Sequence, residues 1–377
     1  MTMERNRFQS LSEDLTRNER RILGLIFRRR AMTQLAIAEE TDLTQQSVSR
    51  IVAGFSDKGL LESGERISAG KRGYPSTSVM ICPRYAYSAG VCIGADAVSF
   101  ALVDFSGTVC YEQRLPLTSL PIERVLNWTH KALDEAFAQL SLAEDSLLGM
   151  GVAISGSFIT DGGFNTPLCL EEWAGVDVAR VFTDRFGVPA FADNDGNAAA
   201  MAESLLGAGR WANSFAYLYI ATGVGGGLIL DGELWRGRFG NAGEFAGGLP
   251  SSIYPFPNLE LLRQLVAKDG MVFDSVDALV QGFDPGWPAI NDWIARVRDS
   301  LSIIASNATS ILDLDAIVLG GKLPKALAER IIPHIEFFDI RRRAISRPMA
   351  KIVAAETSGD PAAIGAALLP LKTGYFG

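Results

Sequence analysis

Residues 91–107 read VCIGADAVSFALVDFSG, and this stretch decides the fold of most of the chain. It predicts a strand, a glycine turn, a second strand and a second turn, a hairpin of the kind that can hold a nucleotide phosphate. Its second part, ALVDFSG at 101–107, is similar to LILDGEL at 228–234. A strand and turn that recur in this way indicate two related halves.

Strand and helix patterns alternate on both sides of this stretch. The first half contains the strands YSAGVCIG, SFALVDF and TVCYEQRL, then the amphipathic helix IERVLNWTHKALDEAFAQL and the buried strand LLGMGVAIS. A second round begins near residue 213 and runs through SFAYLYIATG, GGLILDGEL, several helices, LDAIVLGG and a closing helix at DPAAIGAALLPL. We therefore expect an α/β fold, with two lobes of β-β-β-α-β-α type that enclose a cleft.

The composition is that of a globular protein with more than one domain. The chain has 377 residues, of which 48% are hydrophobic, and 38 glycines. We expect a head at 1–81 and two lobes at 82–200 and 201–377. Without an apolar run of about 18 residues, and with an N-terminus rich in Arg and Glu, we expect no membrane span, no secretory signal and a cytoplasmic location. The four cysteines have no C-x-x-C spacing, which argues against a structural zinc.

The charge is distributed unevenly along the chain. Residues 1–81 hold 13 Lys and Arg against 10 Asp and Glu, which leaves 22 against 33 for residues 82–377. Because an acidic body repels nucleic acid, any contact with DNA has to come from the N-terminal segment.

That segment predicts three short helices followed by a hairpin. An apolar stripe recurs at helical spacing after Asn18, Thr33 can cap a second helix, and Thr44 can cap a third that Gly59 ends. The third helix would present polar side chains at its N-terminal end, where a recognition helix reads the major groove. The predicted DNA-binding residues are Thr44, Gln45, Gln46, Ser47, Ser49 and Arg50 on this helix, with Lys71 and Arg72 at the tip of the hairpin.

Together these features predict a winged helix-turn-helix. The alternative is a small helical protein-binding domain whose polar helix face is only solvated. The RRR run at 28–30 is interpreted as solvated charge that lies close enough to the head to touch phosphates.

The chain resembles the ROK family of repressors, open reading frames and sugar kinases, and its transcriptional regulators in particular. The resemblance rests on the predicted head and on GVCIGADAVSFALVDFSG, FADNDGNAAAMAESLLGAG, ATGVGGGLILDGELWRGRFGNAGE and DAIVLGGKLP. It implies an actin-like, sugar-kinase-type body in two lobes, a DNA-binding head, and assembly as dimers or tetramers.

The phosphate loops depart from the pattern of the family's kinases. Cys92 stands where the kinases have an aspartate that positions Mg²⁺, and Ala95 stands where glycine lets the backbone approach phosphate. We expect Asp96, four residues along the turn, to place its carboxylate elsewhere. Of the two later glycine segments, we interpret 221–227 as a tight hairpin and 320–321 as packing. ATP binding should be weak or lost, and no cofactor is predicted.

The resemblance also carries the predicted ligand-binding residues, which are Asn165, Asn194, Asp195, Glu244 and Phe245. In the kinases Asp195 corresponds to the general base and Asn194 to a sugar contact, and Asn165 and Glu244 match further sugar contacts. The alternative for Asp193 or Asp195 is that it only caps the following helix. Phe245 replaces a histidine that touches sugar and zinc, and the cysteine cluster after it is absent, so no metal is predicted. Phe245 could stack on a sugar or fill the pocket.

We predict a ligand-responsive regulator, most simply a repressor of carbohydrate-use genes, that binds an operator as a homo-oligomer and a small carbohydrate between its lobes. The first alternative is a sugar kinase with an appended head. The second is a constitutive DNA-binding protein whose pocket is filled and which answers to a protein partner.

Overall fold

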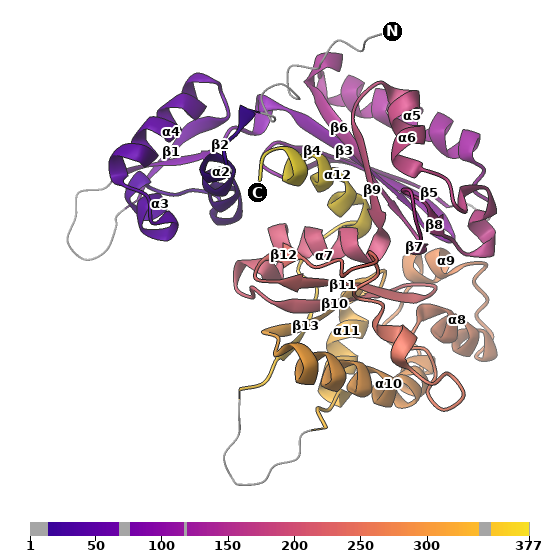
Figure 1. The fold of residues 1–377 in the computed structure, drawn as a ribbon. Helices are drawn as coiled ribbons and strands as arrows, with labels where there is room; N and C mark the ends of the chain where they lie inside the picture. The colour runs from indigo at the N-terminus through magenta and orange to yellow at the C-terminus, as the bar shows by residue number, and fades with distance from the viewer. Residues whose placement is uncertain (1–13, 68–75, 117–118, 339–347, 377) are drawn as a thin grey trace.

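The computed structural model describes residues 14–67, 76–116, 119–338 and 348–376. Its first part is a compact head of three helices and a two-stranded antiparallel hairpin (Figure 1). These elements are α2 (Arg17–Arg29), α3 (Gln34–Thr41), α4 (Gln45–Asp57), β1 (Leu61–Ile67) and β2 (Ser76–Ile81). The winged helix-turn-helix prediction is confirmed, although the predicted tip residues Lys71 and Arg72 lie outside the described residues.

Local signals in the sequence set the ends of the head's helices. The side-chain oxygens of Thr33 and Thr44 accept hydrogen bonds from the amides of Ala36 and Ser47, at 3.3 and 3.2 Å, so both predicted N-caps are confirmed. Helix α4 ends at Asp57, and Gly59 follows with a φ of +77°. Glycine adopts that left-handed conformation without strain, as predicted.

The first lobe is a five-stranded sheet in the order β5-β4-β3-β6-β9. Its strands are β3 (Tyr87–Ile93), β4 (Ala97–Asp104), β5 (Val109–Pro116), β6 (Leu147–Ile154) and β9 (Ala190–Asn194). Helices α5 (Ile122–Leu140) and α6 (Val178–Phe186) cover one face, and a small hairpin of β7 (Ser157–Phe158) and β8 (Phe164–Asn165) projects from it (Figure 1). Buried side chains of these helices and strands form one apolar core.

The second lobe repeats this plan with the strand order β12-β11-β10-β13-β14. Its strands are β10 (Phe215–Ile220), β11 (Val224–Leu230), β12 (Glu233–Leu234), β13 (Ala316–Gly321) and β14 (Lys351–Ala354). Its covering helices are α8 (Leu259–Lys268), α9 (Val276–Gln281), α10 (Ala289–Leu312) and α11 (Lys325–Ile331). In both sheets the middle strand is antiparallel to its neighbour on one side and parallel on the other, which confirms the predicted duplicated fold.

Two helices, α7 (Asp195–Leu206) and α12 (Pro361–Gly374), pack together between the two sheets (Figure 1). Helix α7 lies against β11, whereas α12, at the end of the chain, returns to pack on β3 and β6 of the first lobe. The approach is close because a Cβ on Gly90, Gly151 or Gly365 would overlap backbone of the neighbouring element. The predicted segment 201–377 therefore includes a helix that packs on the first lobe's sheet.

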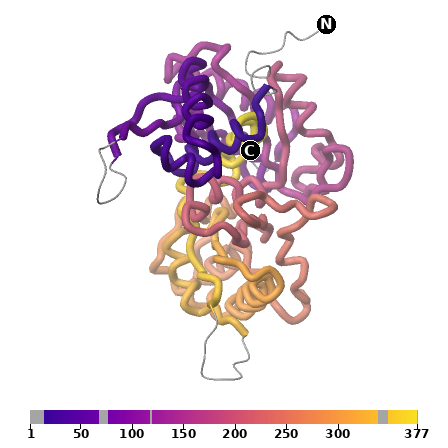
Figure 2. Tube along the Cα trace, turned by 60° about the vertical axis from the view of Figure 1, so that its left-hand side comes forward, coloured from indigo at the N-terminus to yellow at the C-terminus, as the bar shows by residue number. Residues whose placement is uncertain are grey.

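The head is docked on the body through α2 (Figure 2). The ring of Phe27 in α2 lies 4.4 Å from that of Phe376, just beyond α12, and Phe105 lies 5.0 Å from Tyr375 between ring centroids. Arg20 donates hydrogen bonds to the carbonyl oxygens of Thr373 and Gly374. Head and C-terminal helix thus share one apolar cluster.

Across the described residues, we find no helix that combines the length and the apolar character needed to cross a bilayer.

Candidate functional site

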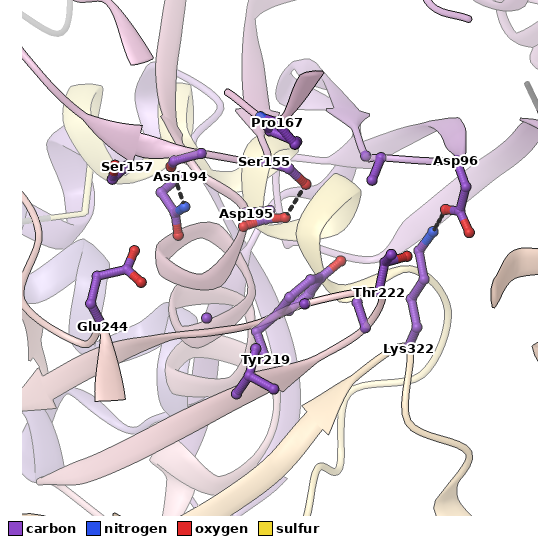
Figure 3. A pocket seen from close by; sticks show the side chains of 17 residues that line it. Asp96, Ser155, Ser157, Pro167, Asn194, Asp195, Tyr219, Thr222, Glu244 and Lys322 are labelled. Carbon is purple, nitrogen blue, oxygen red and sulfur yellow. Dashed lines mark hydrogen bonds and ion pairs between the residues drawn. The ribbon is translucent and has the colours of Figure 1, made fainter. Parts of the chain in front are cut away.

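A cleft between the lobes holds a cavity of about 440 Å³. Its walls come from the β3–β4 turn, the segment after β6, the junction of β9 with α7, the β10–β11 turn and the residue after β13. The carboxyl ends of parallel strands β6, β9 and β13 meet here, where open α/β sheets bind their ligands. Figure 3 shows the cavity with Asn194, Asp195 and Glu244 on one side and Asp96 and Lys322 on the other.

Asn194 and Asp195 stand where β9 passes directly into α7. The Asn194 side-chain oxygen accepts hydrogen bonds from the amides of Gly196 and Asn197, at 2.8 and 3.3 Å, and its amide donates to the Gly156 carbonyl at 2.7 Å. Asn194 is therefore the N-cap of α7. Asp193, which we considered as a cap, instead pairs with Arg236, with oxygen–nitrogen distances of 2.5 and 3.0 Å.

The Asp195 carboxylate is the buried acid of the cleft. It accepts a hydrogen bond from the Ser155 hydroxyl at 2.5 Å and another from the Gly196 amide at 2.9 Å (Figure 3). Burial raises the pKa of Asp195 to about 6, because desolvation outweighs those two hydrogen bonds and the attraction of Lys322. A carboxylate with this pKa can accept a hydrogen bond from a sugar hydroxyl at neutral pH, or accept its proton.

The cleft brings together only some of the predicted ligand-binding residues. Asn194, Asp195 and Glu244 line it, and Glu244 lies at its exposed mouth with a pKa raised by partial burial. Asn165 does not line the cavity, because it pairs with Ser157 in the β7–β8 hairpin and its side chain is exposed.

Phe245 also lies outside the cavity. It begins a short 3-10 turn, Phe245–Gly248, and packs against the core of the second lobe beside Ile304 and Ala308 of α10. The expectation that Phe245 contacts a sugar or fills the pocket is not met by this placement, because the turn directs its ring toward α10.

The opposite end of the cleft contains a feature that the sequence interpretation missed. Lys322 follows the glycines of β13, and its ammonium lies 2.6 Å from Asp96 Oδ1 (Figure 3). Both side chains are largely buried, at 9% and 12% exposure, and Asp96 Oδ2 accepts a hydrogen bond from the Asp277 amide at 2.7 Å. The sequence led us to expect that Asp96 does not replace the carboxylate missing at Cys92. The structure adds that the Asp96 carboxylate lines this cavity, where Lys322 pairs with it.

Cys92 does not line the cavity. Its thiol is 2% exposed among the apolar residues under α12, and burial raises its pKa well above the ordinary value. The thiol is therefore neutral at pH 7 and supplies no charge for a metal ion.

Three further interactions join the lobes around the cleft. Arg114 of β5 pairs with the buried Asp277 of α9. The Asn241 side chain accepts from the Phe158 amide at 2.7 Å and donates to its carbonyl at 2.8 Å. The third is the Arg236–Asp193 pair.

The predicted DNA-reading face is exposed on α4. The side chains of Gln45, Gln46, Ser49 and Arg50 are all solvent-exposed, whereas Val48, Val52 and Phe55 face the core of the head. The hydroxyls of Thr44 and Ser47 lie 2.9 Å apart, so these two residues also form the helix cap.

Two family models match the chain: that of the ROK family over residues 88–250, and that of the MarR family over residues 13–72. The body of the chain is therefore similar to the ROK family over residues 88–250. The first match covers the phosphate loops, β9–α7 and Glu244, and the second covers the winged-helix head, as the resemblance implied.

Curated relatives match the chain at modest identity. An uncharacterized protein, y4fQ, of Sinorhizobium fredii is 28% identical over 96% of this chain and 93% of its own length. The xylose repressor of Bacillus spizizenii is 27% identical over 60% of this chain and 59% of its own length. The chain is therefore similar to an uncharacterized relative over almost its whole length and to a named repressor over a shorter part.

Solved structures support the fold from both branches of the family. A ROK family transcriptional regulator, a homolog of the Escherichia coli MLC protein, gives a TM-score of 0.69 at 19% identity, over 95% of this chain and 96% of its own. A ROK family glucokinase from Streptomyces griseus gives 0.60 at 21% identity, over 75% of this chain and 99% of its own. The glucokinase therefore matches three quarters of this chain, whereas the regulator matches nearly all of it.

Proposed function

We propose that this protein is a cytoplasmic, sugar-responsive transcriptional repressor of carbohydrate-use genes. The observation that carries the proposal is the pairing of an exposed polar helix on a winged-helix head with a cleft that keeps Asn194, Asp195 and Glu244. A carboxylate beside an amide binds sugar hydroxyls in pairs, and a buried polar site rejects ligands that leave it unsatisfied.

Phosphoryl transfer is not part of this proposal. The end of the cleft that holds Asp96 and Lys322, here called the phosphate end, lacks a free carboxylate for a metal ion. Cys92 is a buried neutral thiol, and the Asp96 carboxylate is already occupied by Lys322 and the Asp277 amide. Transfer from ATP depends on metal ions held against the phosphates by free carboxylates. The same end of the cleft is instead used to hold the two lobes together.

A route for the signal follows from the packing of α7 and α12. Asp195 begins α7, α7 packs on α12, and the residues after α12 hold Phe27 of the head. A ligand that changes the angle between the lobes would shift these helices and with them the heads. In a dimer, two heads would read half-sites separated by whole helical turns, so a small shift would change operator affinity.

The decisive experiment is recovery of bound promoter fragments from the genome, followed by titration of the preferred fragment in gel-shift assays. Arg50→Ala should weaken operator binding about tenfold or more, because Arg50 would contact a base edge or phosphate. The control is Arg296→Ala, which removes an exposed arginine on α10. Equal affinity of the Arg50→Ala and unmodified proteins would remove Arg50 from the interface, and the absence of any preferred fragment would overturn the proposal.

The effector is sought by thermal-shift screening with sugars and polyols. A ligand at 100 times its dissociation constant adds about 2.7 kcal/mol to the free energy of unfolding. Asp195→Asn should reduce that stabilisation strongly, because the amide has one acceptor oxygen where the carboxylate has two, and it carries no negative charge. The cavity of about 440 Å³ favours this hypothesis over a filled pocket and control by a protein partner.

A sugar kinase with an appended head remains the second candidate, because Asp195 keeps a pKa of about 6 that suits a general base. ADP release measured across a panel of hexoses decides between the two. Turnover at an ordinary enzymic rate would establish the kinase.

A further inference from the structure

A second and larger cavity lies where the head meets the body. It has a volume of about 820 Å³ and is bounded by α2 and α3 of the head and by the body segment from the 3-10 turn Ala208–Arg210 to Asn213. Glu233 in β12 completes the wall. This head–body groove is separate from the cleft between the lobes and shares none of its lining residues.

Arginines dominate the groove. The head contributes Arg21, Arg28, Arg29 and Arg30, and the body contributes Arg210. These include the whole RRR run at 28–30, which the sequence alone led us to interpret as solvated charge.

The carboxylates that line the groove do not balance these cations. Glu40 pairs with Arg29 at 3.2 Å, and Glu233 is shared between Arg28 at 3.4 Å and Lys372 at 2.9 Å. Arg21 donates hydrogen bonds to the backbone carbonyls of Thr41 and Glu40. The groove therefore carries excess positive charge in a protein whose net charge is -8.

Two residues are placed to receive an anion. Within the described part of the chain, the exposed Arg210 side chain has no hydrogen-bond or ion-pair partner, so its full set of N–H donors is available. Arg30 donates one hydrogen bond to the Ser106 carbonyl at 2.7 Å and keeps its other donors. Arg30 ends α2 with a φ of +69°, a backbone conformation that costs a non-glycine residue free energy and clusters at functional sites.

The local field agrees with this geometry. Desolvation lowers the pKa of Arg30 and repulsion from Arg210 lowers it further, and these two effects outweigh the attraction of Asp104. The pKa of Lys372 is lowered mainly by desolvation, and Arg28 contributes to that shift. Cations that are desolvated close to one another are stabilised by a shared anion.

We propose that the head–body groove binds a small phosphorylated metabolite, with its phosphoryl group held between Arg30 of the head and Arg210 of the body. Arginine forks match phosphate oxygens in a bidentate geometry, and arginines from two elements can hold one phosphate on several sides. The groove faces the body, whereas α4 lies on the far side of the head (Figure 1), so the backbone of operator DNA is the less suitable anion here.

This site would act as a second input to the protein. An anion that joins α2 to the body would fix the head relative to α12, and so would change the affinity for an operator. That regulatory consequence depends on the proposed function, whereas the binding itself does not.

The test titrates the full chain with inorganic phosphate, pyrophosphate, glucose 6-phosphate and AMP, at constant ionic strength set with NaCl. Calorimetry should detect binding of at least one phosphorylated compound, and the comparison of glucose 6-phosphate with AMP identifies the class that carries the phosphoryl group. Arg210→Ala should weaken that binding at least tenfold, because it removes one of the two guanidinium groups that hold the phosphoryl group. The fold should stay intact, because the Arg210 side chain is exposed.

Two control variants make the result specific. Arg296→Ala removes an exposed arginine from α10, and the double variant Asp96→Leu with Lys322→Met removes the ion pair of the cleft without leaving a buried charge unpaired. Neither should change the affinity by more than about twofold. The proposal is overturned if no phosphorylated compound binds, if Arg210→Ala binds as well as the unmodified protein, or if the double variant Asp96→Leu with Lys322→Met abolishes binding.

Operator titration then separates this proposal from the proposed function. If the anion binds through Arg210 and changes operator affinity, both stand. If it binds through Arg210 while no operator is found, the groove stands and the proposed function fails. If operator DNA competes directly with the anion, the groove belongs to the DNA interface and the metabolite site is overturned.

Discussion

The two ends of the cleft between the lobes have diverged in chemistry although they share one cavity. One end, here called the sugar end because of the proposed ligand, is lined by the amide of Asn194 and the carboxylates of Asp195 and Glu244. At the phosphate end, the only charged groups that line the cavity in the described part of the chain are Asp96 and Lys322, which neutralise each other. Recognition of a polyol can therefore persist at one end while the other end is used for structure. The predictions below test whether the two ends are independent in this way.

The largest effect is expected at the phosphate end. Lys322→Met keeps the length of the side chain but leaves the buried Asp96 carboxylate without its cation. Removal of one partner of a buried pair costs about 3–5 kcal/mol of unfolding free energy, and we expect the lower part of that range because Asp96 keeps the Asp277 amide. Urea denaturation followed by circular dichroism measures the change.

The double variant Asp96→Leu with Lys322→Met is the matched control for this prediction. It removes both charges and should recover most of the stability, since apolar replacement of a buried ion pair is often neutral. Equal stability of the Lys322→Met and unmodified proteins would show that the pair is not structural. Neither variant should release ADP from ATP, because Cys92 still supplies no carboxylate.

The next effect is a pH dependence that comes from the sugar end. The folded-state pKa of Asp195, about 6, lies above the ordinary value of 3.8, so the folded chain binds this proton more tightly than the unfolded chain does. Without ligand, the contribution of Asp195 to stability therefore rises as the pH falls from 7 toward 4, by up to about 3 kcal/mol at 1.36 kcal/mol per pKa unit. Asp195→Asn removes this titrating group, so the variant should not show this pH dependence.

The difference in unfolding free energy between the unmodified protein and Asp195→Asn, measured from pH 7 to pH 4.5, checks the sign. As the pH falls, the unfolding free energy of the unmodified protein should rise relative to that of Asp195→Asn. A constant difference would mean that Asp195 is solvated in the folded state. Lys322→Met should shift the dependence to higher pH, because the ammonium favours the ionised carboxylate.

The sequence was sufficient for the architecture but only for part of the site. Helix caps, apolar periodicity and the repeated strand–turn pattern depend on neighbours in the chain, so they identified the head and both lobes. Lys322 and Asp96 are separated by 226 positions, and nothing local marks a lysine after two glycines as the partner of a particular aspartate. Ser155, which holds Asp195, was missed for the same reason.

Phe245 and Arg210 show two other limits of the sequence. Phe245 matches a ligand-contacting position by motif, but a short turn directs its ring to α10, and the direction of a turn is set by packing that a motif does not encode. Arg210 becomes part of a cluster of arginines only because α2, almost two hundred residues earlier in the chain, lies across the groove from it. Long-range packing is therefore the part that local patterns could not supply.

The smallest expected effect tests whether Asn165, which lies outside the cavity, contributes to binding of the effector. Asn165 matches a sugar contact by resemblance, yet its side chain is exposed on β8 and does not line the cavity. Asn165→Ala should change the affinity for the effector, once found, by less than about twofold, because no buried hydrogen bond is lost. Calorimetric titration beside Asp195→Asn, for which a loss of tenfold or more is expected, gives the comparison. A large loss in Asn165→Ala would mean that the β7–β8 hairpin folds over the ligand and that the sugar end extends further than the cavity between the lobes.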